Sequence, residues 1–401
     1  MKKRLLFGII IINSTLFFGQ SVSKTIQLLP DTGQTQSYTT TFGEDQDYLI
    51  NTSSFTNNNN GTITDNVTGL MWQQVDGGEM TIENAIIYCD NLVLAGFSDW
   101  RLPTPIESFS IINHQNSNPA INTSYFTLTT VEYWWTSVFE NNSTTKVWCT
   151  NAGGGIGNHP KTETISAGGT KKFHARAVRT VTNPTTITNH FTDNGDTVTD
   201  NLTQLVWQKI PNTAALTWEQ ALVYAEGLTI GTSLDWRLPN IKELQSLNNE
   251  LATNPSVFSP YFSNVGIHNY WSSTTLPNQP LSAWYWSTAF GITTYSAKTS
   301  TNYLICVRGT PSLSLNNIES HTSIKITPNP SSDFVTISFP SNIDSARIEI
   351  ADAFGKVVLS KQIVINSNEY ILDTGGISEG IYYLSIINGN HKNAFKIIKK
   401  K

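Results

Sequence analysis

The 401-residue sequence has few charged residues, few cysteines and no long apolar run after its first 20 residues. Charged residues make up only 14% of the chain and the net charge is −5, which argues against a nucleic-acid-binding protein. The three cysteines are an odd number, so at least one has no disulfide partner within the chain. Because no later apolar run is long enough to span a bilayer, the sequence predicts no transmembrane segment in the mature protein.

The sequence also lacks the residue patterns of metal sites. It contains no H-E-x-x-H motif, and no two of its seven histidines have the spacing of metal ligands. Residues 192–200 bring Asp193, Asp196 and Asp200 together, but their spacing departs from that of an EF-hand loop, so we interpret them as a hairpin turn. The sequence therefore predicts no metal and no cofactor.

Hydroxyl, amide and aromatic side chains are abundant. All eleven tryptophans lie between Trp72 and Trp286, among many Asn, Thr and Ser residues. This composition is typical of an extracellular, β-rich protein. Residues 21–310 carry 13 basic and 22 acidic residues, a net charge of −9.

The N-terminus has the layout of a secretory signal peptide. Lys2, Lys3 and Arg4 precede an apolar run, and small or polar residues follow it. The alternative is a membrane anchor, but polar residues 13–15 interrupt the run and leave it too short to span a bilayer. We predict a signal peptide over residues 1–20 and a linker over residues 21–50.

The middle of the chain contains an internal repeat. The motif D-W-R-L-P occurs at residues 99–103 and 235–239. Other blocks match in the same order at offsets of 135 or 136 residues, and the offset falls to 129 at the end. Two units are too few for a solenoid, and each is long enough to hold its own core. We predict two domains that fold alone, copy 1 over residues 51–182 and copy 2 over residues 187–310.

Local patterns predict the elements of each copy. Asn60-Gly61 and Asn194-Gly195 are tight-turn signals between strand-like segments, which indicates a hairpin. Residues 80–92 and 216–228 have apolar residues at helical spacing, and Thr217 with Gln220 forms a capping box.

The D-W-R-L-P motif itself is typical of a junction between a strand and a helix. Thr104 or Asn240 follows it as a helix N-cap, with Glu107 or Glu243 three residues later. We predict that its residues are structural, with tryptophan in the core and arginine paired with a carboxylate. These structural residues are Trp100, Arg101, Trp236 and Arg237.

The ordered blocks D-N-x-T-x-L-x-W-Q, T-x-E-x-A, D-W-R-L-P-x-x-x-E, Y-W and V-R resemble the Lcl C-terminal-like domain, in both copies. The R-L-P core also resembles the formylglycine-generating enzymes. The resemblance implies an α+β fold with two C-type-lectin-like domains in tandem, and a role in adhesion and in binding host glycosaminoglycans. Sulfated polymers favour clustered basic residues, so the net charge of −9 argues against that ligand.

The resemblance also implies one cysteine in the first helix and one in the closing strand of each copy. Cys89 lies in the first helix of copy 1, but its expected partner position holds Ala177. Cys306 lies in the closing strand of copy 2, but its expected partner position holds Ala225, so each copy keeps one cysteine of that pair. A Cys89–Cys149 bridge, and a Cys89–Cys306 bridge through exchanged strands, remain open, and loss of half of each bridge is the simpler interpretation. The cysteine pair that the formylglycine-generating class uses is absent, so we predict that the protein is not an enzyme.

Aromatic residues beside short polar residues are the candidates for ligand contact. Flat rings and hydroxyls suit a neutral sugar, whereas the alternative is that these rings fill the core. The candidate ligand-binding residues are Trp134, Trp148, Tyr285 and Trp286.

The last segment, residues 322–401, resembles the C-terminal sorting domain of the Por (type IX) secretion system. It contains P-N-P at residues 328–330, G-I-Y at residues 380–382 and a basic terminus. Alternating strands predict a small all-β sandwich after a linker at residues 311–321. The resemblance implies contact with the type IX machinery, removal of this domain, and release or attachment at the cell surface.

Together these features predict a secreted, surface-displayed, adhesin-like protein that recognises a glycan or another extracellular ligand. The alternatives are a structural or matrix protein without a small ligand, and a formylglycine-generating-enzyme-like enzyme.

Overall fold

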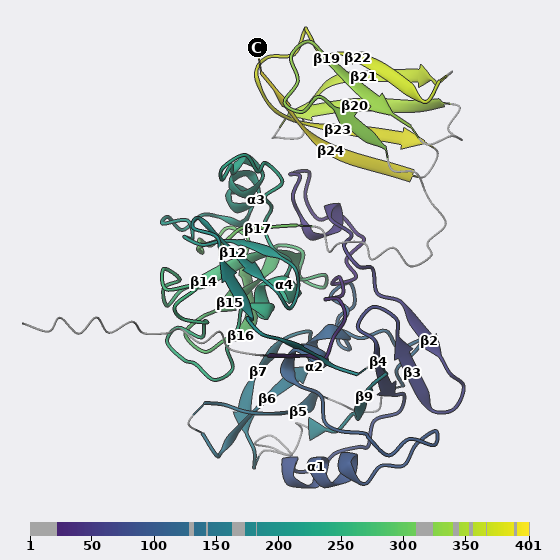
Figure 1. The fold of residues 1–401 in the computed structure, drawn as a ribbon, viewed down its shortest axis with the longest axis vertical. Helices are drawn as coiled ribbons and strands as arrows, with labels where there is room; N and C mark the ends of the chain where they lie inside the picture. Colours follow the sequence, from purple (N-terminus) through teal and green to yellow (C-terminus); the bar gives the residue numbers. More distant parts are fainter. Residues whose placement is uncertain are drawn as a thin grey trace, which may run out of the picture.

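A computed structural model describes most of the chain (Figure 1). The predicted signal peptide and the predicted linker at residues 311–321 lie outside the described residues. Within the part that is described, no helix is long and apolar enough to cross a membrane. The described residues are 22–127, 132–141, 143–162, 173–181, 183–309, 324–339, 345–352, 356–365, 367–388 and 391–400.

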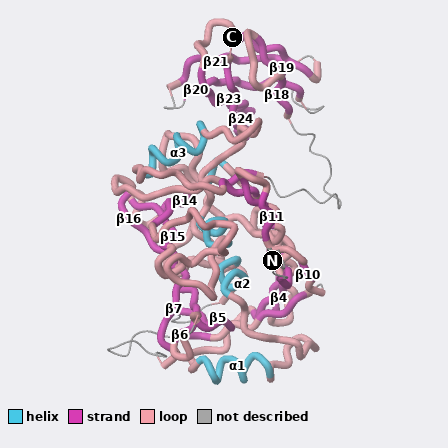
Figure 2. Tube along the Cα trace, turned by 60° about the vertical axis from the view of Figure 1, so that its left-hand side comes forward, coloured by secondary structure: helices cyan, strands magenta, loops and turns pink. Residues whose placement is uncertain are grey.

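The structure is mostly β, with a few short helices (Figure 2). In its described residues, copy 1 has two four-stranded sheets and two helices. The sheets have the strand orders β2-β3-β4-β9 and β7-β6-β5-β8, and among these strands β5 and β8 pair in parallel. Its elements are β2 (Phe55–Asn57), β3 (Thr62–Asp65), β4 (Leu70–Gln73), α1 (Ile82–Asp90), α2 (Pro105–Ser110), β5 (Tyr133–Phe139), β6 (Lys146–Asn151), β7 (Ile156–Pro160), β8 (Phe173–His174) and β9 (Val178–Thr180).

Copy 2 repeats this arrangement, with sheets of order β11-β12-β13-β17 and β14-β15-β16. Its elements are β11 (Phe191–Asp193), β12 (Thr197–Asp200), β13 (Val206–Gln208), α3 (Trp218–Gly227), α4 (Ile241–Ser246), β14 (Asn269–Thr275), β15 (Ser282–Ser287), β16 (Ile292–Ala297) and β17 (Val307–Arg308).

The predicted hairpins and helices are confirmed. Gly61 and Gly195 lie in the turns before β3 and β12 with φ of 84° and 90°, a backbone region that glycine adopts without strain. Capping boxes begin α2, α3 and α4 as predicted. Residues 192–200 form the hairpin of β11 and β12, in which Asp193 pairs with Lys209 at 2.7 Å.

Like elements of the two copies pack against each other. Helix α2 contacts α4, and strand β7 contacts β16, so each element meets its own counterpart, as in a two-fold symmetric dimer. One apolar cluster joins Phe109 and Trp148 of copy 1 to Ile241 and Trp284 of copy 2. Figure 1 shows the copies stacked along the long axis, with the C-terminal domain beyond copy 2.

The copies therefore have both separate and shared cores. Separate clusters form around Trp135 in copy 1 and Trp271 in copy 2. A larger cluster contains Trp72 of copy 1, Trp207 of copy 2 and Ile26 from the segment before them. The prediction of one core per copy is thus incomplete, because burial of the shared clusters requires both copies.

Residues 22–51, which we call the strap, are not the linker that the sequence predicted. The strap begins with β1 (Val22–Lys24), which pairs with β10 (Thr185–Ile187) between the copies, and contains a 3-10 helix (Asp45–Asp47). Ile26, Asp31 and Asp45 are each 2% exposed. The strap lies between the copies because its apolar residues join the shared core and its polar groups bond to both copies.

The C-terminal domain is the predicted all-β sandwich. Its sheets have the orders β18-β19-β22 and β21-β20-β23-β24 and enclose an apolar core. Its strands are β18 (Lys325–Thr327), β19 (Phe334–Ser338), β20 (Ser345–Asp352), β21 (Val357–Val364), β22 (Glu369–Asp373), β23 (Gly380–Asn388) and β24 (His391–Lys399).

Candidate functional site

The two D-W-R-L-P segments form corresponding corners that hold each copy together. In copy 2, the Arg237 guanidinium donates two hydrogen bonds of 2.6 Å to Glu243, the N3 residue of α4. Glu243 also accepts from the backbone N–H of Asn240, so one carboxylate fixes both the arginine and the helix N-terminus. Trp236 is 1% exposed. This geometry agrees with the structural role predicted for the segment.

The corner of copy 1 has the same bonds but is more open. Arg101 donates to Glu107 at 2.7 Å with both terminal nitrogens, and Trp100 is 2% exposed. The Arg101 side chain is 33% exposed, compared with 5% for Arg237. Burial alone would raise the pKa of Glu107, but the Arg101 contact outweighs it and lowers that pKa.

Three of the four aromatic candidates for ligand contact are in the interior. Trp134, Trp148 and Trp286 are 4%, 1% and 0% exposed, so none of them offers a face to a sugar. Tyr285 is half-buried and lies edge-on against Trp271. The four residues do not converge on one surface, because Trp148 joins the cluster between the copies, whereas Trp286 joins the larger shared core. The predicted aromatic binding surface is therefore wrong for these three residues.

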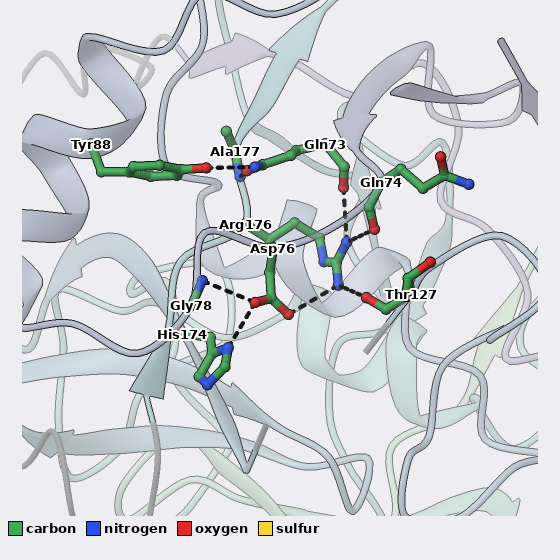
Figure 3. A network of polar contacts seen from close by, with 9 residues as sticks. All are labelled: Gln73, Gln74, Asp76, Gly78, Tyr88, Thr127, His174, Arg176 and Ala177. Carbon is green, nitrogen blue, oxygen red and sulfur yellow. Dashed lines mark hydrogen bonds and ion pairs between the residues drawn. The ribbon is translucent and has the colours of Figure 1, made fainter. Parts of the chain in front are cut away.

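A buried polar network fills the interior of copy 1 (Figure 3). His174 Nδ1 lies 2.7 Å from Asp76 Oδ1, and Arg176 lies 3.5 Å from Asp76 Oδ2. Arg176 also donates to the backbone carbonyls of Gln73 and Gln74, at 2.8 and 2.5 Å. Burial pushes the pKa of Asp76 up, but His174 and Arg176 outweigh it, so that pKa is lowered. The arrangement pairs the buried Arg176 charge with a carboxylate, although the Arg176 Nε has no hydrogen-bond partner among the described residues.

Copy 2 has no such network at the corresponding place. Counterpart residues are identified by the paired strands, in which Arg101 bridges Val178 and Arg237 bridges Val307. In this register Ile305 replaces Arg176, Tyr303 replaces His174 and Pro211 replaces Asp76. Ile305 is fully buried in the larger shared core. A network present in only one copy is better explained by local packing than by a chemistry shared by the domain.

The cysteines and acidic clusters offer no reactive centre in the residues that the structure describes. Cys89, Cys149 and Cys306 are buried and form no disulfide, which agrees with the loss of half of each bridge. Burial raises the pKa of Cys89 to about 12, so its thiol stays protonated and unreactive. No group of three His, Cys, Asp or Glu residues could hold a metal ion in this part of the chain.

A cavity of about 270 Å³, which we call the junction cavity, lies between the copies. Copy 1 contributes the start of α2 and copy 2 the end of α4, while the first residues of the strap form a third wall. Ile26, Pro105 and Ile106 provide apolar surface, and Gln245 and Glu250 provide polar groups. A cavity of this size and mixed character suits part of a small or extended ligand.

Polar groups at the junction cavity are incompletely satisfied. Gln245 is 5% exposed and donates to the Gly291 carbonyl, yet its Oε1 has no hydrogen-bond partner among the described residues. Burial raises the pKa of the Glu250 carboxyl to about 7. A buried amide oxygen without a partner is costly, but this oxygen has almost no accessible surface, so a ligand in the cavity does not reach it.

A second, larger cavity of about 600 Å³ lies between copy 2, the strap and the C-terminal domain. Its walls include Tyr48, Trp236 and, from the C-terminal domain, Lys396. Tyr48 and Tyr383 both donate to the buried Glu226 carboxyl, at 2.7 and 3.3 Å. This cavity depends on the C-terminal domain for one of its walls.

Family models match most of the folded chain. Residues 61–181 and 196–308 each match the Lcl C-terminal domain, which together is more than half of the sequence. The chain belongs to the Lcl C-terminal domain family. Residues 325–400 match the secretion system C-terminal sorting domain, which identifies a secreted, cell-surface protein that interacts with the type IX secretion machinery. No curated protein matches the chain.

The sequence did not reveal the junction cavity of this Lcl-domain protein. Its lining comes from segments far apart in the chain, and no single motif contains them. One signal was available: residues 22–51 contain an apolar pair, Ile26 and Leu29, within a polar segment that was interpreted as a linker. An apolar pair there indicates a segment that packs against the domains.

Proposed function

We propose that the protein is a secreted, surface-displayed binding protein, adhesin-like and without catalytic activity, that recognises a glycan or another extracellular ligand. The observation that carries this proposal is the junction cavity, with apolar walls beside amide and carboxyl side chains. Short polar groups beside apolar walls fix the orientation of a ligand while burying its surface. The tandem arrangement then has a purpose, because neither copy alone would form the cavity.

The junction cavity suits the mature protein better than the larger cavity does. Its lining residues all lie between Val22 and Phe258, so removal of the sorting domain leaves it complete. The larger cavity would lose Asn329, Lys396 and Ile398. We also propose that each copy is C-type-lectin-like, supported by its two helices packed with small, mainly antiparallel sheets.

Binding to a glycan array tests the proposal. Full-length protein should bind a defined set of glycans or, on a parallel array, of extracellular matrix proteins, and Ile106→Trp should weaken that binding by filling the cavity. Ile87→Trp is the matched control, because Ile87 is 57% exposed on α1 and does not line the cavity. Equal binding by both variants would place the ligand elsewhere, and a protein that binds nothing on either array would favour the structural or matrix alternative.

Export gives an independent test of the surface location. Deleting residues 322–401 should leave folded repeats in the periplasm, because the sorting domain has a core separate from that of the repeats. Protein collected from the cell surface should lack both residues 1–20 and the sorting domain by intact mass. A surface species that still carries residues 330–401 would contradict removal of the sorting domain.

A further inference from the structure

The interface between the copies has two ends that should be alike but are not. Because α2 packs against its counterpart α4, each end is built from the start of one helix and the residues that follow the other. At one end this arrangement leaves the junction cavity. At the other end the strap occupies the corresponding place.

The strap binds its end as a turn, with Gly33 at φ of 85°, through two backbone carbonyls and one side-chain amide. The Lys242 ammonium donates to the Asp31 carbonyl at 2.8 Å, and the backbone N–H of His114 donates to the Thr32 carbonyl at 2.8 Å. The Gln34 side-chain amide donates to the His114 carbonyl at 3.0 Å and accepts from the backbone N–H of Thr275 at 3.1 Å. Residues 31–34 are thus held in the manner of a bound peptide.

The same positions in the other copy line the junction cavity. At the offset of 136 residues, Lys242 corresponds to Ile106 and His114 corresponds to Glu250, and both counterparts line the cavity. Thr274, which donates to the strap residue Asp45 at 2.5 Å, corresponds to Val138, which also lines it. The cavity is therefore the symmetry-related equivalent of a groove that a peptide segment fills.

We infer that the junction cavity binds a short polypeptide segment of an extracellular partner, in the place equivalent to that of strap residues 31–34. This inference rests on the proposed binding function and names the ligand class of the same site. The occupied end is direct precedent that this groove geometry accepts a polypeptide backbone. The precedent favours a peptide over a sugar, since the tryptophans that would have stacked on a sugar are buried.

The side chains of the open end indicate which peptides fit. Ile106 replaces the ammonium of Lys242, so this position favours an apolar residue where the strap presents a carbonyl. The Glu250 carboxyl lines the cavity and accepts hydrogen bonds, so it favours N–H, ammonium or hydroxyl groups. An acidic peptide is disfavoured, because Glu250 would repel it and the segment 21–310 has a net charge of −9.

A displayed library of random decapeptides tests the inference. The full-length chain is used to select peptides, which are synthesised and titrated by calorimetry against the wild type and two variants. Ile106→Trp fills the cavity and should weaken binding at least tenfold, whereas Ile87→Trp makes the same change on exposed α1 and should bind as the wild type does. The selected peptides should pair an apolar residue with a basic or hydroxyl residue.

A second variant and a parallel glycan array separate the outcomes. Glu250→Lys reverses the charge of a half-buried lining residue and should abolish binding of basic peptides even if Ile106→Trp fails to fold. The inference is overturned if the selected peptides bind Ile106→Trp and Glu250→Lys as tightly as the wild type. It is also overturned if the library yields no enriched sequence. If glycans bind the wild type but not Ile106→Trp, and no peptide is enriched, the proposed function stands and the polypeptide inference is wrong. If neither probe binds, both fail.

Discussion

The residues just before the closing strand β9 of copy 1 bring Arg176 into the interior, at the position where copy 2 has Ile305. Around Arg176, copy 1 assembles a carboxylate, an imidazole and backbone carbonyls, whereas copy 2 packs the same volume with apolar side chains. The D-W-R-L-P corners, in contrast, keep the same bonds in both copies. The corner is therefore part of the domain's architecture, whereas the interior beside the closing strand accepts either a network of paired charges or an apolar core.

The largest expected effect tests the part that the copies share. Trp236→Ala and Trp100→Ala should each lower the free energy of unfolding by about 3–5 kcal/mol, because both rings are almost fully buried. Urea unfolding followed by tryptophan fluorescence measures this, since all eleven tryptophans lie in the repeats and none lies in the sorting domain. If either variant keeps wild-type stability but loses ligand binding, the corner is a binding site and the structural interpretation fails.

The next effect should differ between the two corners. Arg237→Ala leaves the Glu243 carboxylate buried without its partner and should cost about 3–5 kcal/mol. Arg101→Ala should cost less, about 1–2 kcal/mol, because the Arg101 side chain is 33% exposed and water can reach the site that it vacates. Equal losses in the same unfolding assay would show that solvent exposure does not set the strength of these pairs.

The polar network of copy 1 gives a third test. Asp76→Ala should cost about 3 kcal/mol, because Arg176 is 1% exposed and would keep its charge without a carboxylate. Asp99→Ala is the matched control: Asp99 pairs with Arg179, but its side chain is 59% exposed, so the loss should stay below about 1 kcal/mol. If the two variants lose the same stability, the network contributes no more than a surface pair.

Much of each copy could be predicted from sequence because the signals were local. A Gly in a tight turn, a Thr or Asn three residues before Glu or Gln, and apolar residues at helical spacing all act within one element. Thr104 with Glu107 and Asn240 with Glu243 therefore became capping boxes as expected. The matching blocks also predicted the duplication, which the family models confirm.

The relation between the copies could not be predicted from the same signals. Trp148 was predicted to contact a ligand because it stands beside short polar residues, but the second copy covers what a single copy would expose. The strap looked like a linker because its many polar residues suggested solvent, yet its Asp31 and Asp45 are buried between the copies. Alternation within a strand shows that two faces differ, but it does not show what covers each face.

The last comparison is between equivalent positions at the ends of the first helices. Glu226 in α3 is 2% exposed beneath the strap and the sorting domain, whereas its counterpart in α1, Asp90, is exposed. Burial raises the pKa of Glu226 to about 7, although Tyr48 and Tyr383 donate to the carboxyl and partly oppose the shift. The folded protein therefore holds the proton of Glu226 more tightly than the unfolded chain, whose carboxyl titrates near 4.5.

It follows that the stabilising effect of protonated Glu226 is complete below pH 4.5 and is lost as the pH rises through 7. Between pH 5 and pH 8 the wild type should lose about 2–3 kcal/mol of unfolding free energy relative to Glu226→Gln, which has no proton to release. Tryptophan-detected urea unfolding at the two pH values measures the difference. Asp90→Asn should leave the pH dependence unchanged, because Asp90 faces solvent. If Glu226→Gln and the wild type change equally with pH, Glu226 is not held protonated beneath the sorting domain, and the two helix ends are electrostatically alike.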